Sequence, residues 1–189
     1  SSSSWPSFFK TWNGSSSTAW GTNANWTPSG VPTACNNVVI NSGGNQPSIA
    51  SNINAYCNDL TINTGATLTN NAGGSKVFEI SGNIICNGTL AHASTKLIRL
   101  IAVNKTIAGN LTNANNLIEI DGGSYRLNGN VQIWELTIDN NATPGSISLG
   151  SNTLTIVNKL TQNGLIYQET GTLQIEDPQA VLTQGSFMY

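Results

Sequence analysis

The sequence predicts an all-β protein, a right-handed parallel β-helix of about eight coils with a tryptophan-rich cap at its N-terminal end. The main observation is a set of hydrophobic triplets that recur at intervals of 18 to 22 residues. Their outer residues are apolar and all but one of their central residues are polar, as in a strand with one buried face. A repeat of about 20 residues suits one coil of a β-solenoid, which buries its apolar face against neighbouring coils. The triplets begin at Val38, Leu60, Phe78, Ile98, Ile118, Leu136, Leu154 and Leu173.

A second observation is an internal similarity at an offset of 76 residues, which places Leu60 on Leu136 and Asn87-Gly88 on Asn163-Gly164. A slip of one residue would turn every side chain of a strand to the opposite face, so ungapped agreement indicates a structural repeat. The variable coil length favours the right-handed form over a strict hexapeptide solenoid.

A third observation is the composition. The 189 residues are 38% hydrophobic, enough for one substantial domain, and only 8% are charged. Asn, Thr, Ser and Gly supply the polarity and suit the turns between short strands. We expect a cap or linker over residues 1–34, the solenoid over 35–182, and a tail over 183–189 that continues or packs on a partner.

The N-terminal segment contains four of the five tryptophans. The first coil of a solenoid would otherwise expose apolar side chains and unpaired strand edges, and large aromatic residues cover such an end with few residues. A platform that stacks against sugars is the open alternative. The residues concerned are Trp5, Trp12, Trp20 and Trp26.

The patterns of charge and of apolar residues exclude two classes of function. The net charge is −2, and the seven basic residues are scattered, so no stripe is available to neutralise a nucleic-acid backbone. Apolar runs are all far shorter than the roughly 18 residues of a transmembrane helix, so we expect no membrane insertion.

Two of the three cysteines occupy equivalent positions, three residues before their triplets. Stacked coils would bring Cys35 and Cys57 to about one strand spacing, roughly 4.8 Å, which is within the range of disulfide-linked Cα atoms. The sequence therefore predicts a disulfide between them and an oxidising, extracellular setting, with two small buried residues as the alternative.

The N-terminal half resembles a known group of proteins. Its motifs are Thr11-Trp12-Asn13-Gly14, Trp20, Asn25-Trp26, Gly30-Val31-Pro32 and Asn37-Val38-Val39-Ile40. This succession resembles the opening of secreted cell-surface repeat proteins of Bacteroidetes, and the likeness extends over about residues 11 to 85. The resemblance implies a β-solenoid in a large adhesin that is exported by type IX secretion to the cell surface.

The best candidate for catalysis is a row formed by Glu79, Arg99 and Glu119, the central residues of three successive triplets. Their two carboxylates would lie about 9.6 Å apart, near the upper limit for an inverting glycosidase. Arg99 between them would lower the pKa of both carboxyl groups, whereas a general acid needs a raised pKa. We therefore interpret the row as an ion ladder and expect no enzyme.

Two weaker patterns concern ligands. Asp121 and Asp139 are candidate ligands for a Ca²⁺ between coils, but no acidic motif repeats, so we expect no cofactor. Thr61, Thr137 and Thr155 share the central triplet position, which is the pattern of an ice-binding rank, but charged residues interrupt it.

These observations favour a structural or adhesive module of an extracellular bacterial surface protein. The alternatives are a β-helix that binds or degrades polysaccharide, as a lyase or glycosidase does, and an ice-binding protein. Partners would be further coils of the same polypeptide, other surface-assembly subunits, or carbohydrate. We expect further coils or subunits because the C-terminal end should have an open apolar edge, near Leu173, Ile175, Val181 and Leu182.

Overall fold

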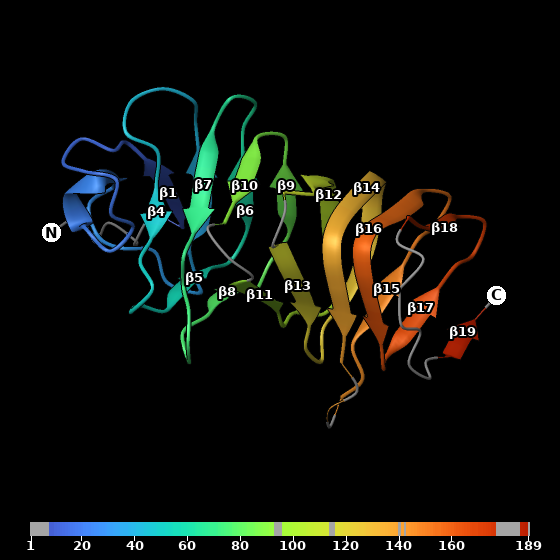
Figure 1. The fold of residues 1–189 in the computed structure, drawn as a ribbon. Coiled ribbons are helices and arrows are strands. Elements are labelled where there is room, and N and C mark those ends of the chain that lie inside the picture. The colour runs from blue at the N-terminus through green and yellow to red at the C-terminus, as the bar shows by residue number, and fades with distance from the viewer. Residues whose placement is uncertain are drawn as a thin grey trace, which may run out of the picture.

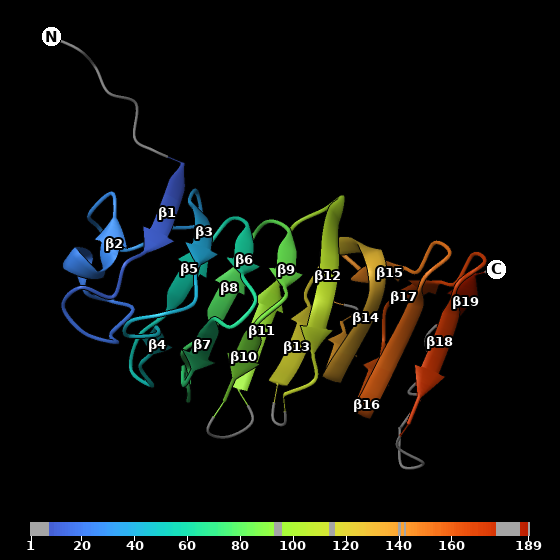
Figure 2. The same cartoon turned by 90° about the horizontal axis from the view of Figure 1, so that it is seen from above.

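The chain is an all-β solenoid of about six turns, built from three faces that follow one another around each coil. The computed structural model describes residues 8–92, 96–113, 116–139, 141, 143–176 and 186–188. Strands of successive coils lie side by side along the axis, with the two termini at opposite ends (Figures 1 and 2). No helix of the described residues has the length and apolarity needed to span a bilayer.

The first face runs along the whole stack as a parallel sheet. Most of its described inward residues are buried, whereas the residues between them are mostly partly or fully exposed, because side chains alternate along a strand. Its strands are β1 (Phe9–Trp12), β3 (Asn37–Ile40), β6 (Leu60–Ile62), β9 (Ile84–Cys86), β12 (Lys105–Leu111), the first part of β14 (Ser124–Ile138), β15 (Ser146–Ser148), β17 (Leu165–Tyr167) and β19 (Ser186–Met188).

The second face begins as a separate three-stranded sheet and continues on the longer strands of the C-terminal half. Register shifts between Ile107 and Gly109 in β12, and between Ile133 and Glu135 in β14, turn one continuous strand from one face to the next. The strands of this face are β4 (Ser48–Ile49), β7 (Thr67–Asn70), β10 (Thr89–Ala91), the later parts of β12 and β14, the first part of β16 (Thr153–Gln162), and β18 (Thr172–Ile175).

The third face closes each coil. Its residues pair in strict register from Ala55 to Leu160, with an apolar residue at both inward positions of nearly every coil. Its strands are β5 (Ala55–Cys57), β8 (Phe78–Ile80), β11 (Lys96–Leu100), β13 (Asn116–Ile120) and the last parts of β14 and β16.

The core is one continuous cluster along the axis, made of the inward residues of all three faces. It is mainly aliphatic, with aromatic residues gathered toward the N-terminal end, and most of its members are less than 2% exposed. Corners bring backbones too close for larger side chains. A Cβ atom on Gly88 would lie 2.4 Å from the carbonyl oxygen of Ala66, so this corner requires glycine.

The predicted β-helix is confirmed, but eight coils are too many. Five of the seven predicted pairings between successive triplets are correct, and two are wrong. Leu60 pairs with Ile84, and Leu136 with Leu160, instead of with the next triplet in the sequence. In both places the next triplet lies on a different face, two-thirds of a coil ahead. All three faces share the same alternation, so triplets from different faces look alike.

The N-terminal segment extends the stack. β1 pairs in parallel with β3, while β2 (Trp26–Thr27) pairs antiparallel with β1 and ends the sheet. A short 3-10 turn (Asn23–Asn25) precedes β2. Ala19 forms a bridge with Ser48, so this segment also continues the second face.

Candidate functional site

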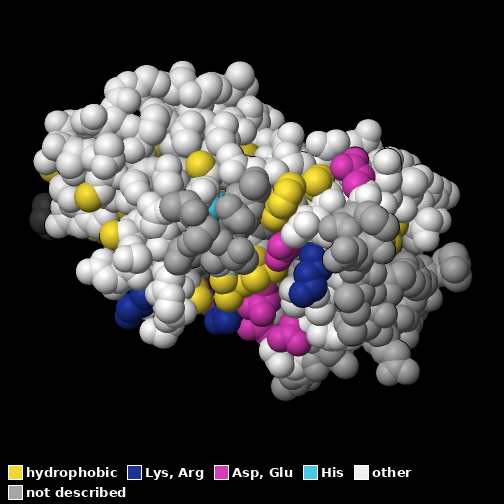
Figure 3. Space-filling model, viewed as in Figure 1, with side chains coloured by type: hydrophobic (Ala, Val, Ile, Leu, Met, Phe, Trp, Pro, Cys, Tyr) yellow, Lys and Arg dark blue, Asp and Glu magenta, His cyan; other side chains and the backbone are white. Residues whose placement is uncertain are grey.

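The three residues of the predicted charged row lie on the outside of the third face. Arg99 in β11 pairs in register with Glu79 in β8 and with Glu119 in β13. The predicted alignment across three coils is therefore correct. Figure 3 shows acidic and basic side chains gathered near the middle of the face viewed there, while most of that face is uncharged.

The ion pairs of Arg99 differ in part from the prediction. Its Nε atom lies 3.0 Å from Glu119 Oε2 and 3.5 Å from Asp121 Oδ2. The hydrogen bond to Glu119 is the main cause of a raised pKa for Arg99, and the charges of Asp121 and Glu79 add to it. Asp121 thus takes the pairing role predicted for Glu79, which acts on Arg99 only through its charge.

The two candidate calcium ligands, Asp121 and Asp139, lie close together, but both accept hydrogen bonds from one side-chain amide. Asn141 Nδ2 donates hydrogen bonds of 2.9 Å to Asp121 Oδ1 and 2.6 Å to Asp139 Oδ2. Both oxygens of Asp121 are therefore engaged, one by Asn141 and the other by Arg99. In the described part of the chain, no three His, Cys, Asp or Glu residues are grouped as metal ligands.

The predicted disulfide is absent. All three cysteines are free thiols, and Cys35 is exposed whereas Cys57 and Cys86 are buried. The register is as expected, because the N–H of Asn58 donates to the carbonyl of Asn36 across the two coils. Stacking of the backbone does not align the side chains, since Cys57 belongs to β5 and points into the core while Cys35 lies in a loop outside any strand.

The predicted cap aromatics form a buried cluster. Trp26 makes edge-to-face contacts with Trp12 at 4.9 Å and with Trp20 at 4.7 Å between ring centroids. Trp20 also contacts Phe78 on the third face, at 5.5 Å. All three tryptophans are at most 5% exposed, so they offer no open stacking platform for a sugar. Trp5 lies outside the described residues.

The three threonines of the predicted ice-binding rank lie on three different faces. Thr61 belongs to the first face, Thr137 to the third, and Thr155 to the second, where it is 5% exposed. They therefore form no common plane.

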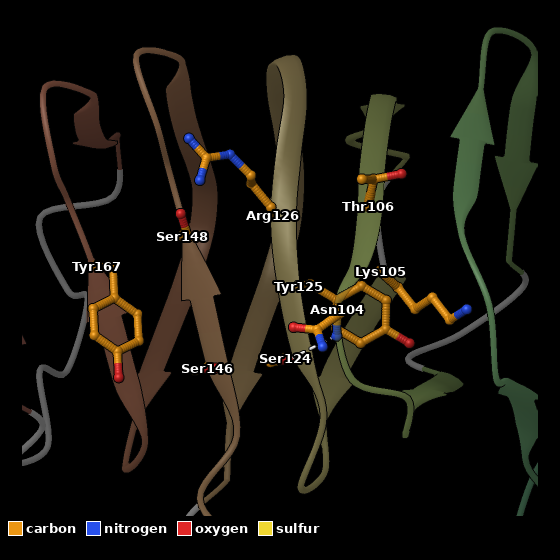
Figure 4. Close-up of a pocket in the computed structure, with 9 residues that line it drawn as sticks. All are labelled: Asn104, Lys105, Thr106, Ser124, Tyr125, Arg126, Ser146, Ser148 and Tyr167. Atoms are coloured by element: carbon orange, nitrogen blue, oxygen red, sulfur yellow. Dashed lines mark hydrogen bonds between the residues drawn. The ribbon is translucent and has the colours of Figure 1, made fainter.

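A groove on the first face was not predicted from the sequence. It encloses a volume of about 350 Å³ and crosses β12, β14, β15 and β17 (Figure 4). Outward side chains at successive coils form its main row, in the register Thr106, Arg126, Ser148, Tyr167. These residues follow the coil period, but they lie outside the triplets, so the search for triplets missed them.

Arg126 is held in place by its surroundings in the groove. Its Nη2 atom lies 3.2 Å from Glu169 Oε2, and Ser148 Oγ donates a 2.5 Å hydrogen bond to Glu169 Oε1. Gly150 has φ +61°, and a Cβ there would lie 2.8 Å from Arg126 Nη2, so glycine leaves room for the guanidinium. The groove is thus lined by hydroxyl groups, an amide, two tyrosine rings and two cations, and the adjacent Glu169 carboxylate is already engaged.

Comparison with known proteins identifies a family. A family model described as Domain of unknown function (DUF8693) matches residues 11–127, which is more than half of the chain. No curated protein and no solved structure matches the chain. The matched residues contain the tryptophan cluster and the charged row but only part of the groove, which extends to Tyr167. The chain belongs to the DUF8693 family.

Proposed function

We propose that this chain is a structural and adhesive module of a secreted bacterial surface protein and that it performs no catalysis. The observation that carries this proposal is the uninterrupted stack, in which one hydrophobic core runs through the described coils. Each coil contacts only its neighbours, so such a stack is long, stiff and extendable coil by coil. These are the properties of a spacer that holds a binding surface away from a cell.

The charged row supports a role without catalysis. A general acid must be free to give a proton to its substrate, whereas Glu119 and Asp121 are both held in ion pairs with Arg99. The row joins β11 and β13 and so contributes to stacking rather than to proton transfer.

The two ends of the stack have different proposed roles. The tryptophan cluster serves as a cap, because it covers the first apolar residues and its last strand, β2, runs antiparallel. At the other end Leu173 and Ile175 are only partly buried, although Leu154 and Ile156, one coil earlier, are fully buried. We propose that further coils of the same polypeptide cover β18, in the right-handed winding typical of parallel crossovers.

Surface labelling tests this proposal. Antibodies raised against the purified chain should label intact producing cells, and beads coated with the chain should attach to surfaces to which albumin-coated beads do not attach. Incubation with plant, algal and bacterial polysaccharides should release no reducing ends or unsaturated uronates. Labelling only after lysis, or cleavage of any of these polymers, would overturn the proposal.

A further inference from the structure

The groove on the first face presents two parallel rows of outward polar side chains. Beside the main row that runs from Thr106 to Tyr167, a second row is formed by Asn104, Ser124 and Ser146. Successive coils repeat at about 4.8 Å, so a linear molecule lying along the axis meets a new pair of side chains at each coil. Hydroxyl and amide groups both donate and accept hydrogen bonds, which suits a ligand that is itself rich in hydroxyl groups.

Two left-handed backbone conformations border this groove. Among the described residues other than glycine, Asn104 (φ 57°) and Glu169 (φ 52°) have positive φ angles, and both border the groove. Left-handed backbone is unfavourable for glutamate and is typically retained where the surroundings or a function require it. The left-handed conformation of Glu169 allows its carboxylate to accept hydrogen bonds from both Arg126 and Ser148.

The electrostatics of the groove favour an anion. Arg126 gives one of its five N–H donors to Glu169 and can offer the others to a ligand. Lys105 lines the same groove and forms no ion pair with any other described residue. Lys105 and Arg126 together outweigh Glu169, which makes this groove positive in a chain whose net charge is −2.

We propose that this groove binds an acidic saccharide, with its carboxylates at Lys105 and Arg126, its hydroxyl groups on the serine rows, and one sugar ring against Tyr167. The aromatic ring supplies an apolar surface for the carbon face of a sugar. Nucleic acid is a poorer fit, because tight binding of a phosphate backbone requires more cations than these two. The inference goes beyond the proposed structural role, since it concerns binding by the purified protein wherever that protein resides.

Titration calorimetry with two matched oligomers tests the inference. The first is a chain of six glucuronates joined as in cellulose, and the second is cellohexaose, in which an uncharged hydroxymethyl group replaces each carboxylate. We expect the glucuronate oligomer to bind at least about tenfold more tightly, since hydrogen bonds to charged groups are the stronger ones. Its affinity should fall as the salt concentration rises.

Three variants locate the site. Lys105→Gln and Tyr167→Ala should each weaken binding by about tenfold, whereas Tyr167→Phe, which keeps the ring, should retain most of it. The matched control is Lys159→Gln, which removes the same charge from an exposed position outside the groove and should change nothing. Circular dichroism confirms that each variant is folded.

Three results would overturn the proposal. The first is that neither oligomer binds at millimolar concentration, and the second is that both bind equally well. The third is that Lys105→Gln and Lys159→Gln have the same effect while a short polyphosphate competes without any dependence on Tyr167. That pattern would indicate attraction by net charge alone.

Discussion

The two ends of the solenoid bury the same residue type to different extents. On the second face Ile49 at the N-terminal end is fully buried, whereas Ile175 at the last described coil is only partly buried. Ser48, next to Ile49, bridges to Ala19, which brings the tryptophan segment over this coil. In the described residues β18 pairs with β16 alone. The comparison teaches that burial in a solenoid depends on the neighbouring coil, not on the local sequence.

The largest effect is expected from a substitution at the covered N-terminal end. Trp20→Ala should lower the free energy of unfolding by about 3–5 kcal/mol, because it removes a fully buried ring that contacts Trp26 and Phe78. The control is Trp134→Ala, which removes a partly exposed ring outside the cluster and should cost clearly less. Urea denaturation measures both. Equal losses would show that the tryptophan cluster has no special role at this end.

The next prediction compares the two ends directly. Ile49→Ala should cost about 2–5 kcal/mol, as is usual for a buried isoleucine, and Ile175→Ala should cost less than about half as much. The same side-chain atoms are removed in both variants, so the difference in the free energy of unfolding measures coverage by the neighbouring coil. If Ile175→Ala costs as much as Ile49→Ala, the C-terminal end is covered as well as the N-terminal end.

A third prediction concerns pH and the buried thiols near the covered end. Burial raises the pKa of Cys86 to about 11 from an ordinary value of 9.0, and burial also raises that of Cys57. Between pH 9 and pH 11 the Cys86 thiol loses its proton in the unfolded chain but keeps it in the folded chain. The stabilisation is therefore complete below pH 9 and is lost as the pH rises toward 11, by about 2 kcal/mol for Cys86.

Denaturation curves at several pH values check this decline. Cys86→Ala should flatten the dependence, whereas Cys35→Ala, at an exposed thiol, should leave its slope unchanged. Burial raises the pKa of Tyr125 to about 12. Tyr125 should therefore extend the decline in the free energy of unfolding beyond pH 11 in all three proteins. A free energy of unfolding that stays constant between pH 9 and 11 would contradict the prediction.

The smallest effect is expected at the middle of the stack, away from both ends. Arg99→Gln should lower the free energy of unfolding by about 0.5 kcal/mol, because its ion pairs with Glu119 and Asp121 are partly exposed to solvent. The loss should shrink in concentrated salt. A double-mutant cycle with Glu119→Gln isolates the pair, and a coupling energy above about 2 kcal/mol would show that the row matters more than the ends.

Much of the fold could be predicted from local pattern. The alternation inside each triplet identified inward and outward residues, and the row from Glu79 through Arg99 to Glu119 lies in the predicted register. The groove could not be predicted in the same way. Arg126 and Tyr167 lie on one row only because the intervening corners have particular lengths, and Glu169 reaches Arg126 from a loop after β17.

The offset of 76 residues illustrates the limit. The corner at Asn87-Gly88 donates both backbone N–H groups to the carbonyl of Ile62, and the corner at Asn163-Gly164 donates likewise to Ile138. The local similarity is therefore genuine. However, Ile62 lies on the first face and Ile138 on the third, so the offset is not a whole number of coils, and a reading of it as four coils is wrong.

The sequence by itself determined that the chain is a parallel β-helix, which residues of most strands face inward, and that a group of tryptophans lies at its N-terminal end. Only the tertiary structure decided which face each triplet occupies, how many turns there are, and that Cys35 and Cys57 stay apart. The physical reason is that alternation is set within a strand, by the pleat of the backbone. The face is set by the corners, whose lengths vary and whose path depends on packing against the coils on either side.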